Sequence, residues 1–452
     1  MVSLQNAKTE LASANKDIIE FINAFVDEMS FVQTDAFMCS QNEFAESPGE
    51  GVVSGFASVD GTPVCLFATN PAVLKGSIGA LNAKKITRTI NNAVRMDKPL
   101  IAVWDTSGAR IAEGVDCLDG YGDILRAFTV AYGDIPVISV IKGNNYGISS
   151  FVAGISDFVI AFPDASSASA SPLVIAAKTG GAEKTVGSAK QLAERGIVTN
   201  IADKKSFKKT LAEILSIYSA SRETSDDPNR VCKGLKAGAP VDAVIKEVFD
   251  KNSFLAVREQ FAPVVVTGFA MLAGINVGVV ATDVTKNDGR LSSDACVKIS
   301  EFLNVCENAE TPVVFITDCV GTEICADDAR LIREMSNLIY QINSLDTDMF
   351  AVVTGKAIGS AYTALVSPCE YKIAWEGAEI AALESEASAR LMYADEIKKA
   401  KDKDKAAQKI AKAYSEENSS AVLIAKSGHF DNVIEPNHTR QYLIAALLAH
   451  VE

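Results

Sequence analysis

Two pairs of glycine-containing turns are the first groups in this sequence that could do chemistry. Gly108 and Gly147 each follow a short run rich in Val and Ile, in WDTSGARIAEG and VISVIKGNNYGISS. Gly321 and Gly359 repeat the pattern later, in FITDCVGTEIC and FAVVTGKAIGSAY. The need for a positive φ angle would by itself explain each glycine. Because both turns recur, we expect two main-chain oxyanion sites, in which N–H groups at strand ends stabilise an enolate or a tetrahedral thioester oxygen.

Other common catalytic groups are missing from the sequence. The three histidines, His429, His438 and His450, all lie in the last stretch of the chain. There is no GxSxG nucleophile turn and no GxxxxGK[ST] phosphate loop. The nine cysteines form no CxxC pair, so we expect buried, reduced thiols and no metal site. The sequence therefore disfavours histidine acid–base, triad, ATPase and metal mechanisms.

A basic cluster could bind phosphate groups. It lies in LKGSIGALNAKKITRTINNAVR and comprises Lys75, Lys84, Lys85, Arg88 and Arg95. The pattern predicts a helix that gathers the phosphates of a nucleotide-like ligand, and the alternative is an ordinary solvated helix face. For Arg110, just beyond the first turn, an ion pair with a carboxylate such as Glu113 is a further alternative.

An internal repeat sets the organisation of the chain. Gly55-Phe56 and Gly268-Phe269 lie 213 residues apart, and the same offset relates Pro99 to Pro312. Short apolar runs alternate with helical patterns such as 83–95 and 295–309, which predicts α/β domains built of stacked βα units. Polar residues 221–234 are the expected seam. We predict two copies of one domain, residues 1–225 and 226–452.

Composition narrows the class of protein. The chain has 452 residues, 48% of them hydrophobic, and a formal net charge of −14. This acidic balance argues against binding to nucleic acid. No apolar run reaches the roughly 20 residues needed to span a bilayer, so a cytoplasmic protein without direct membrane insertion is expected.

The ordered motifs resemble the acyl-CoA carboxyltransferase family. The similar segments are PGEGVVSGFASVDGTPV, LKGSIGALNAKKI, DTSGARIAEGVDCLDGYGDI, IPVISVIKGNNYGISS, FAPVVVTGFAMLAG, TPVVFITDCVG, GKAIGSAYTALVS and DNVIEPNHTRQYL. This family includes the β subunits of propionyl-CoA and acetyl-CoA carboxylases and the α subunits of biotin-dependent acyl-CoA decarboxylases. The resemblance implies two tandem crotonase/ClpP-like domains, the first for acyl-CoA and the second for biotin.

The resemblance also implies the reaction and its partners. A carboxyl group moves between biotin and the α-carbon of a short acyl-CoA, either in a carboxylase or, in reverse, in a decarboxylase. Biotin arrives on a separate carrier protein, because none of the eight methionines precedes a lysine as in a biotin-acceptor sequence. The expected partners are this carrier, a biotin carboxylase or a membrane decarboxylase subunit, and further copies of the chain in a dimer or a trimer of dimers. Such an assembly brings the first domain of one chain to the second domain of another.

Site residues follow by matching the family motifs. The enolate site falls on Gly147 and Ile148, with Ser107, Gly108 and Ala109 in the neighbouring turn. The biotin-side site falls on Ser360 and Ala361 with Gly359 and Gly321, and Thr363 is at the position that helps to select acyl size.

The sequence departs from the family where relatives have Gly-Gly. Here the pairs are Gly147-Ile148 and Gly359-Ser360. A Cβ at Ile148 is expected to crowd the acyl group or to require an unusual φ angle. These departures keep open a non-catalytic scaffold subunit, and a hydratase or thioesterase with Glu113 as general base is a third possibility.

Overall fold

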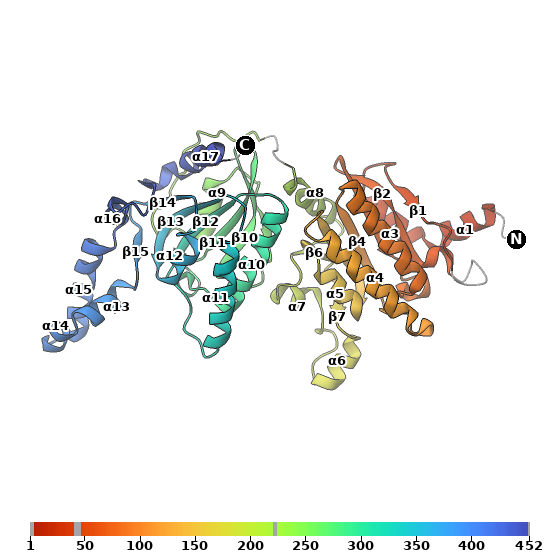
Figure 1. The fold of residues 1–452 in the computed structure, drawn as a ribbon, viewed down its shortest axis with the longest axis horizontal. Helices are drawn as coiled ribbons and strands as arrows, with labels where there is room; N and C mark the ends of the chain where they lie inside the picture. The colour runs from red at the N-terminus through yellow and green to blue at the C-terminus, as the bar shows by residue number, and fades with distance from the viewer. Residues whose placement is uncertain (1–3, 40–46, 220–223, 451–452) are drawn as a thin grey trace. The chain divides into compact units, whose positions relative to one another are not determined.

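The computed structural model describes residues 4–39, 47–219 and 224–450 and divides into two compact units (Figure 1). The N-terminal unit is Met1–Tyr218 and the C-terminal unit is Ser219–Glu452. The expected boundary at 225/226 lies slightly further along the chain. Part of the expected seam, residues 221–223, is outside the described residues, and the rest folds onto the C-terminal unit, where Cys232 joins the core.

A mixed sheet forms the centre of the N-terminal unit. Its strand order is β1-β2-β3-β4-β5-β6-β8, and β7 pairs with β5. The β1/β2 and β2/β3 pairs are antiparallel, and the other pairs are parallel. The strands are Val32–Thr34 (β1), Val52–Val59 (β2), Thr62–Thr69 (β3), Leu100–Thr106 (β4), Val137–Tyr146 (β5), Phe158–Ala161 (β6), Ser166–Ala168 (β7) and Asn200–Ile201 (β8).

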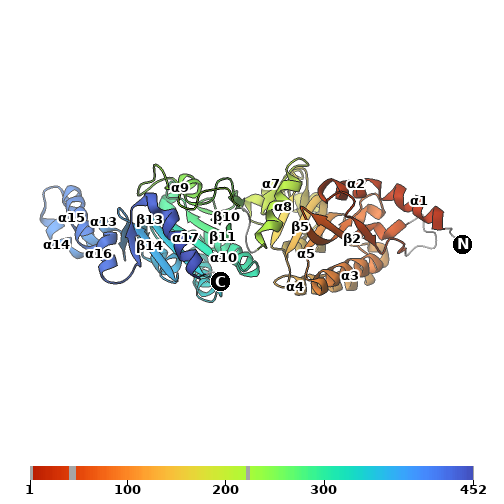
Figure 2. The ribbon, with the colours of Figure 1, turned by 90° about the horizontal axis from the view of Figure 1, so that it is seen from above.

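Helices cover both faces of this sheet. Helices α3 (Ala80–Met96) and α4 (Asp116–Ala131) lie on one face, and α2 (Lys16–Phe25) and α8 (Phe207–Ile217) lie on the other (Figure 2). Ile86 and Ile90 of α3 pack with Phe128 of α4 and Trp104 of β4 in one apolar cluster, which explains the spacing of the apolar residues in α3. The remaining helices are α1 (Leu4–Ala14), α5 (Ile148–Gly154), α6 (Pro172–Thr179) and α7 (Ala189–Glu194).

The C-terminal unit repeats this architecture. Its strand order is β9-β10-β11-β12-β13-β14-β16, and β15 pairs with β13. The strands are Leu255–Val257 (β9), Val265–Leu272 (β10), Ile275–Thr282 (β11), Val313–Cys319 (β12), Met349–Ile358 (β13), Tyr371–Trp375 (β14), Glu379–Ala381 (β15) and Asn432–Ile434 (β16). The helices are Val241–Val248 (α9), Ser293–Asn308 (α10), Asp328–Ile342 (α11), Ser360–Leu365 (α12), Ser385–Met392 (α13), Ala394–Lys399 (α14), Lys403–Asn418 (α15), Ala421–Lys426 (α16) and Thr439–His450 (α17).

Matching registers confirm the repeat. In the N-terminal unit the β4/β5 pairing shifts before Thr106 pairs with Asn145. In the C-terminal unit the β12/β13 pairing shifts at the same place, before Cys319 pairs with Ala357. Both predicted helices are also confirmed, as α3 and α10. No helix within the described ranges combines the length and the apolar character needed to cross a membrane.

Candidate active site

The two glycine turns of the N-terminal unit lie together at the ends of β4 and β5. Gly108 has a φ of +99°, and a Cβ built on it would lie 2.8 Å from the carbonyl oxygen of Tyr146, so a larger residue does not fit. Gly147 has a φ of +74° with open space beside it, so its requirement for glycine is conformational. This turn leads directly into α5.

Main-chain donors in these turns are only partly free. The N–H of Gly147 donates to the carbonyl oxygen of Ala168 at 2.9 Å, and that of Gly108 donates to Thr106 Oγ1 at 3.1 Å. The expectation that Gly147 supplies its own N–H is therefore wrong, because the pairing of β5 with β7 already uses that donor. Ile148 and Ser149 are the first two residues of α5, so their N–H groups have no acceptor within the helix.

The C-terminal unit builds the same arrangement. Gly321 and Gly359 have φ angles of +85° and +55°. The N–H of Gly359 donates to the carbonyl oxygen of Ala381 at 2.9 Å, as Gly147 does to Ala168. The N–H groups of Ser360 and Ala361, at the start of α12, are left without an acceptor in the helix. Each unit thus presents two main-chain donors at one strand end.

Ile148 does not distort the turn. The positive φ angle falls on Gly147, and Ile148 has the ordinary conformation of a helical residue. Its half-buried side chain packs against the apolar cluster under α3 and α4. The expectation that a Cβ here requires an unusual φ angle is wrong, because the chain has already turned one residue earlier.

Asp105 and Asp318 support the turns of the two sites. The family motifs did not point to either aspartate. The Asp105 carboxylate accepts the N–H of Asn144 at 3.2 Å and forms an ion pair with Lys142 Nζ at 3.2 Å. In the C-terminal unit, Asp318 accepts the N–H of Lys356 at 2.8 Å, and burial raises its pKa. A Cβ on the neighbouring glycine would collide with either carboxylate. The recurrence of Asp at the end of both strands was the sequence signal for this role.

Arg110 and Glu113 form the predicted ion pair. Arg110 Nη1 lies 2.9 Å from Glu113 Oε1 and 2.7 Å from Glu50 Oε2. The second oxygen of Glu113 accepts the N–H of Ala80 at the start of α3, at 2.6 Å. Both carboxylate oxygens already accept a hydrogen bond, which supports a structural role for Glu113 over that of a general base.

The basic cluster does not act as one surface. Lys84 and Lys75 are exposed, but Lys85 is fully buried and donates to the carbonyl oxygens of Gly49 and Val52 at 3.2 and 2.5 Å. Lys85 therefore cannot bind the phosphates of a ligand, and its assignment to the basic cluster is wrong. Arg88 is exposed and forms an ion pair with Asp35 at 2.8 Å.

The remaining assigned residues lie around the turns. Ser107 is exposed, and its N–H donates to the carbonyl oxygen of Lys75 at 3.1 Å. Ala109 forms a bridge with Ile78. Thr363 is exposed one turn along α12, and its hydroxyl donates to the carbonyl oxygen of Ser360 at 3.2 Å. In the part of the chain that the structure describes, no group of three or more His, Cys, Asp or Glu side chains could hold a metal ion.

Comparison with known proteins identifies the class to which this repeated fold and its paired donor turns belong. The carboxyl transferase domain matches residues 10–452, so the chain belongs to the carboxyl transferase family. This confirms the family predicted from the motifs.

Named relatives extend the comparison. The chain is 31% identical to the propionyl-CoA carboxylase carboxyltransferase subunit of Haloferax mediterranei, over 95% of this chain and 89% of that protein. It is also 31% identical to the methylmalonyl-CoA decarboxylase α subunit of Veillonella parvula, over 93% and 87% respectively. Its fold matches the crystal structure of the hexameric transcarboxylase 12S core with bound methylmalonyl-CoA, with a TM-score of 0.92 at 25% identity, covering 100% of this chain and 96% of that one. This confirms the predicted crotonase-type α/β fold.

Proposed function

We infer that this chain is the carboxyltransferase subunit of a biotin-dependent acyl-CoA carboxylase. It moves a carboxyl group between biotin, carried on a separate protein, and the α-carbon of a short acyl-CoA. The names of its relatives support both this reading and the reverse reaction of a decarboxylase α subunit. The structural observation that carries the proposal is the recurrence of one main-chain donor site in both units.

The N-terminal unit supplies the enolate site in this proposal. The N–H of Ile148, with that of Ser149 beside it, binds the thioester oxygen of the acyl-CoA. This oxygen becomes negatively charged when the α-carbon loses its proton or its carboxyl group, so donors fixed at the start of a helix favour the enolate over the thioester. Gly108 lets the neighbouring turn approach the same place.

The C-terminal unit fits the ureido group of biotin. The N–H groups of Ser360 and Ala361 have no acceptor in α12, so both can donate to the ureido oxygen of biotin. When bound, biotin supplies a transferable carboxyl group on its ureido nitrogen. The N–H groups orient the ureido oxygen, and Thr363, two residues beyond Ala361, contributes to the choice of acyl chain.

The proposed CoA contacts are Lys75, Lys84 and Arg88, which are exposed, with Arg88 also paired to Asp35. Lys85 is not among them, because its ammonium group is buried and donates to two carbonyl oxygens. The proposed partners are a biotin carrier protein and a biotin carboxylase or membrane decarboxylase subunit. We also propose a homo-oligomer, a dimer or a trimer of dimers in the cytoplasm, in which a biotin site of one chain meets an acyl-CoA site of another.

A carboxyl-transfer assay tests the function. Purified chain is incubated with malonyl-CoA or methylmalonyl-CoA and free biotin, and the loss of the acyl-CoA carboxyl group is measured. Transfer to biotin is the expected result. Absence of transfer with both substrates, together with absence of CoA binding by calorimetry, would overturn the proposal in favour of a non-catalytic scaffold subunit.

A further inference from the structure

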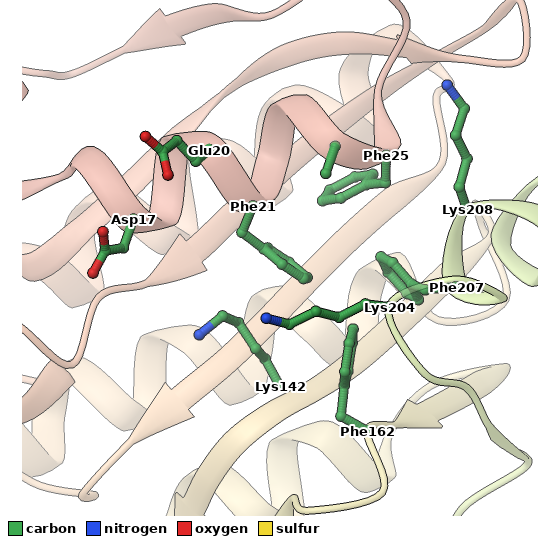
Figure 3. Close-up of a pocket in the computed structure, with 10 residues that line it drawn as sticks. Asp17, Glu20, Phe21, Phe25, Lys142, Phe162, Lys204, Phe207 and Lys208 are labelled. Carbon is green, nitrogen blue, oxygen red and sulfur yellow. The ribbon is translucent and has the colours of Figure 1, made fainter.

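A cavity of about 520 Å³ opens in the N-terminal unit on the sheet face that α2 and α8 cover (Figure 3). It therefore lies on the opposite face from α3 and α4. Its volume is within the range of ligand-binding clefts. The lining residues are Asp17, Glu20, Phe21, Ala24 and Phe25 of α2, Lys142 of β5, Phe162, Lys204, and Phe207 and Lys208 of α8.

Aromatic rings form the floor of this groove. Phe207 is central, with its ring centroid 5.8 Å from that of Phe21, 5.3 Å from that of Phe25 and 5.3 Å from that of Phe162. Lys142 Nζ lies 5.6 Å from the centre of the Phe21 ring. Phe25, Phe162 and Phe207 are buried and Phe21 is half-buried, so an apolar side chain in the groove would meet mainly the Phe21 ring.

Charged side chains surround the rings. Lys142 and Lys204 extend into the same part of the groove beside Phe21, while Asp17 and Glu20 lie along α2 (Figure 3). Lys142 is paired with Asp105. Within the described residues Lys204 forms no ion pair, and Lys208 donates to the carbonyl oxygen of Val26 at 3.4 Å and interacts electrostatically with Asp27. The lysine side of the groove is therefore suited to an acidic group.

The internal repeat shows what occupies this position in the C-terminal unit. The strand registers place Thr354 at the position of Lys142 and Trp375 at that of Phe162. The matching starts of α8 and α17 place Arg440 at the position of Lys208. Trp375 and Arg440 are fully buried, whereas Lys208 is exposed. The C-terminal unit is therefore closed where the N-terminal unit is open.

An irregular segment, residues 226–239, closes the C-terminal unit. The N–H of Gly238 donates to the carbonyl oxygen of Thr354 at 3.3 Å, and the N–H of Cys232 donates to that of Asn437 at 2.9 Å. The side chains of Cys232 and Ala239 are buried in the core beside Trp375. A short polypeptide segment thus fills the counterpart of the groove through main-chain hydrogen bonds and small apolar side chains.

Among the described residues of the N-terminal unit, no segment covers the groove in this way. The residues before α2 form α1, whose C-terminal end lies beside the turn at Pro48–Gly51. The end of α1 is held there by Asn70, whose Nδ2 donates to the carbonyl oxygen of Ala14 at 2.9 Å. Helix α1 is therefore held elsewhere in the same unit and does not cover the groove.

We propose that this groove binds an extended segment of a partner polypeptide, with an apolar side chain against the Phe21 ring and acidic side chains beside Lys142 and Lys204. The covering segment of the C-terminal unit is the template for this mode of binding. Lys142 stands where the C-terminal unit has Thr354, and Lys208 stands where it has the buried Arg440. These lysines predict that the partner segment is acidic. The inference does not rest on the proposed carboxyl transfer, although Lys142 of the groove pairs with Asp105, which supports the donor turn.

Labelled peptides test the proposal by fluorescence anisotropy with the full chain. One peptide has the sequence of residues 226–240, and a second carries Lys233→Glu and Lys236→Glu, which lie between the contacts of Cys232 and Gly238. The second peptide is expected to bind at least about tenfold more tightly, because opposite charges meet across the groove. Failure of the second peptide to bind at millimolar concentration would overturn the proposal.

Matched variants of the protein locate the binding. Lys204→Glu is expected to weaken binding of the acidic peptide about tenfold, whereas Lys205→Glu, an equal change of charge one residue outside the lining, is expected to leave it nearly unchanged. Equal effects of the two variants would mean that only the overall charge matters and would refute the groove. Binding of decanoate without binding of either peptide would assign the groove to small apolar anions and would also refute the proposal.

Discussion

Lys298 makes in the C-terminal unit the contacts that Lys85 makes in the N-terminal unit. Each ammonium group is buried and donates to two carbonyl oxygens, those of Gly49 and Val52 for Lys85 and those of Phe261 and Val265 for Lys298. Lys298 lies 213 residues after Lys85, which is the offset of the repeat. Both lysines therefore tie their helix, α3 or α10, to the chain around the start of β2 or β10, and this shared role is structural.

Adjacent lysines of α3 should respond in opposite ways to charge reversal. Lys85→Glu places a carboxylate against two carbonyl oxygens in a buried site, and we expect a loss of at least about 3–5 kcal/mol in the free energy of unfolding. Lys84→Glu should leave stability within about 0.5 kcal/mol and weaken CoA binding. Urea unfolding and calorimetry with CoA measure the two effects. Equal stability of the two variants would contradict the burial of Lys85.

The two buried lysines should contribute stability that increases with pH above neutrality. Burial lowers the pKa of Lys298 to about 7, with Arg258 and Lys286 adding repulsion, and burial lowers that of Lys85 to about 8. Between these values and the ordinary 10.5, the unfolded chain binds more protons than the folded chain, so stability rises with pH. The limit is about 1.4 kcal/mol per pH unit for each lysine.

Urea midpoints between about pH 7 and 8 measure this effect as a difference between variants with the same cysteines, because thiols of the unfolded chain begin to ionise in this range and oppose it. Lys298→Met should reduce the slope, and Lys209→Met, an exposed lysine of α8, should not. A slope that Lys298→Met leaves unchanged would show that Lys298 is not desolvated.

Removing one main-chain donor should separate catalysis from folding. Proline is tolerated at the first position of a helix, where its missing N–H has no helical acceptor. Ile148→Pro therefore deletes the proposed enolate donor and keeps the start of α5. We expect at least about a 100-fold loss in the rate of carboxyl transfer. Ile148→Val keeps the N–H and should remain within a few-fold of the parent chain, and circular dichroism checks the fold of both. Comparable rates for the two variants would exclude Ile148 N–H as the donor.

The same substitution tests the C-terminal site. Ser360→Pro should also abolish transfer, while Ser360→Ala, which keeps the main-chain donor, should remain active. CoA binding, which is proposed for the other unit, should be unchanged in both variants and serves as the internal control. Loss of activity in Ser360→Ala would move the role from the main chain to the hydroxyl group.

Acid should destabilise the C-terminal unit through Asp226. Burial opposes ionisation of Asp226, but hydrogen bonds from Arg230 and from the N–H of Lys251 lower its pKa to about 2 from the usual 3.8. The folded chain thus favours the carboxylate, and this stability is present above pH 3.8 and lost as pH falls towards 2.

Asp226→Asn should cost about 2 kcal/mol at neutral pH and flatten the acid limb of a urea-midpoint profile. Asp227→Asn, next to it and exposed, is the matched control. An acid limb that is equally steep in both variants would show that Asp226 does not control it.

Sequence reasoning reached the fold because its signals are local. The buried strands of parallel sheets are uniformly apolar, and helices that cover them repeat apolar residues every three or four positions. The recurrence of Gly55, Pro99 and Gly108 in the second half then identified two copies of one unit. The positions of both donor turns followed, because a strand end that opens a helix is marked by its glycine.

The tertiary structure alone decided which charges were available and which surfaces were open. Lys84 and Lys85 are adjacent lysines, but the packing of α3 against β2 buries Lys85 and leaves Lys84 exposed. The two carbonyl oxygens that Lys85 contacts belong to residues more than 30 positions away in the chain. The Gly147 N–H likewise donates to a residue that is distant in the sequence, Ala168 of β7. Likewise, residues 226–239 cover one sheet while α1 leads away from the other. Partners that are distant in sequence control burial and pairing, and no local pattern records them.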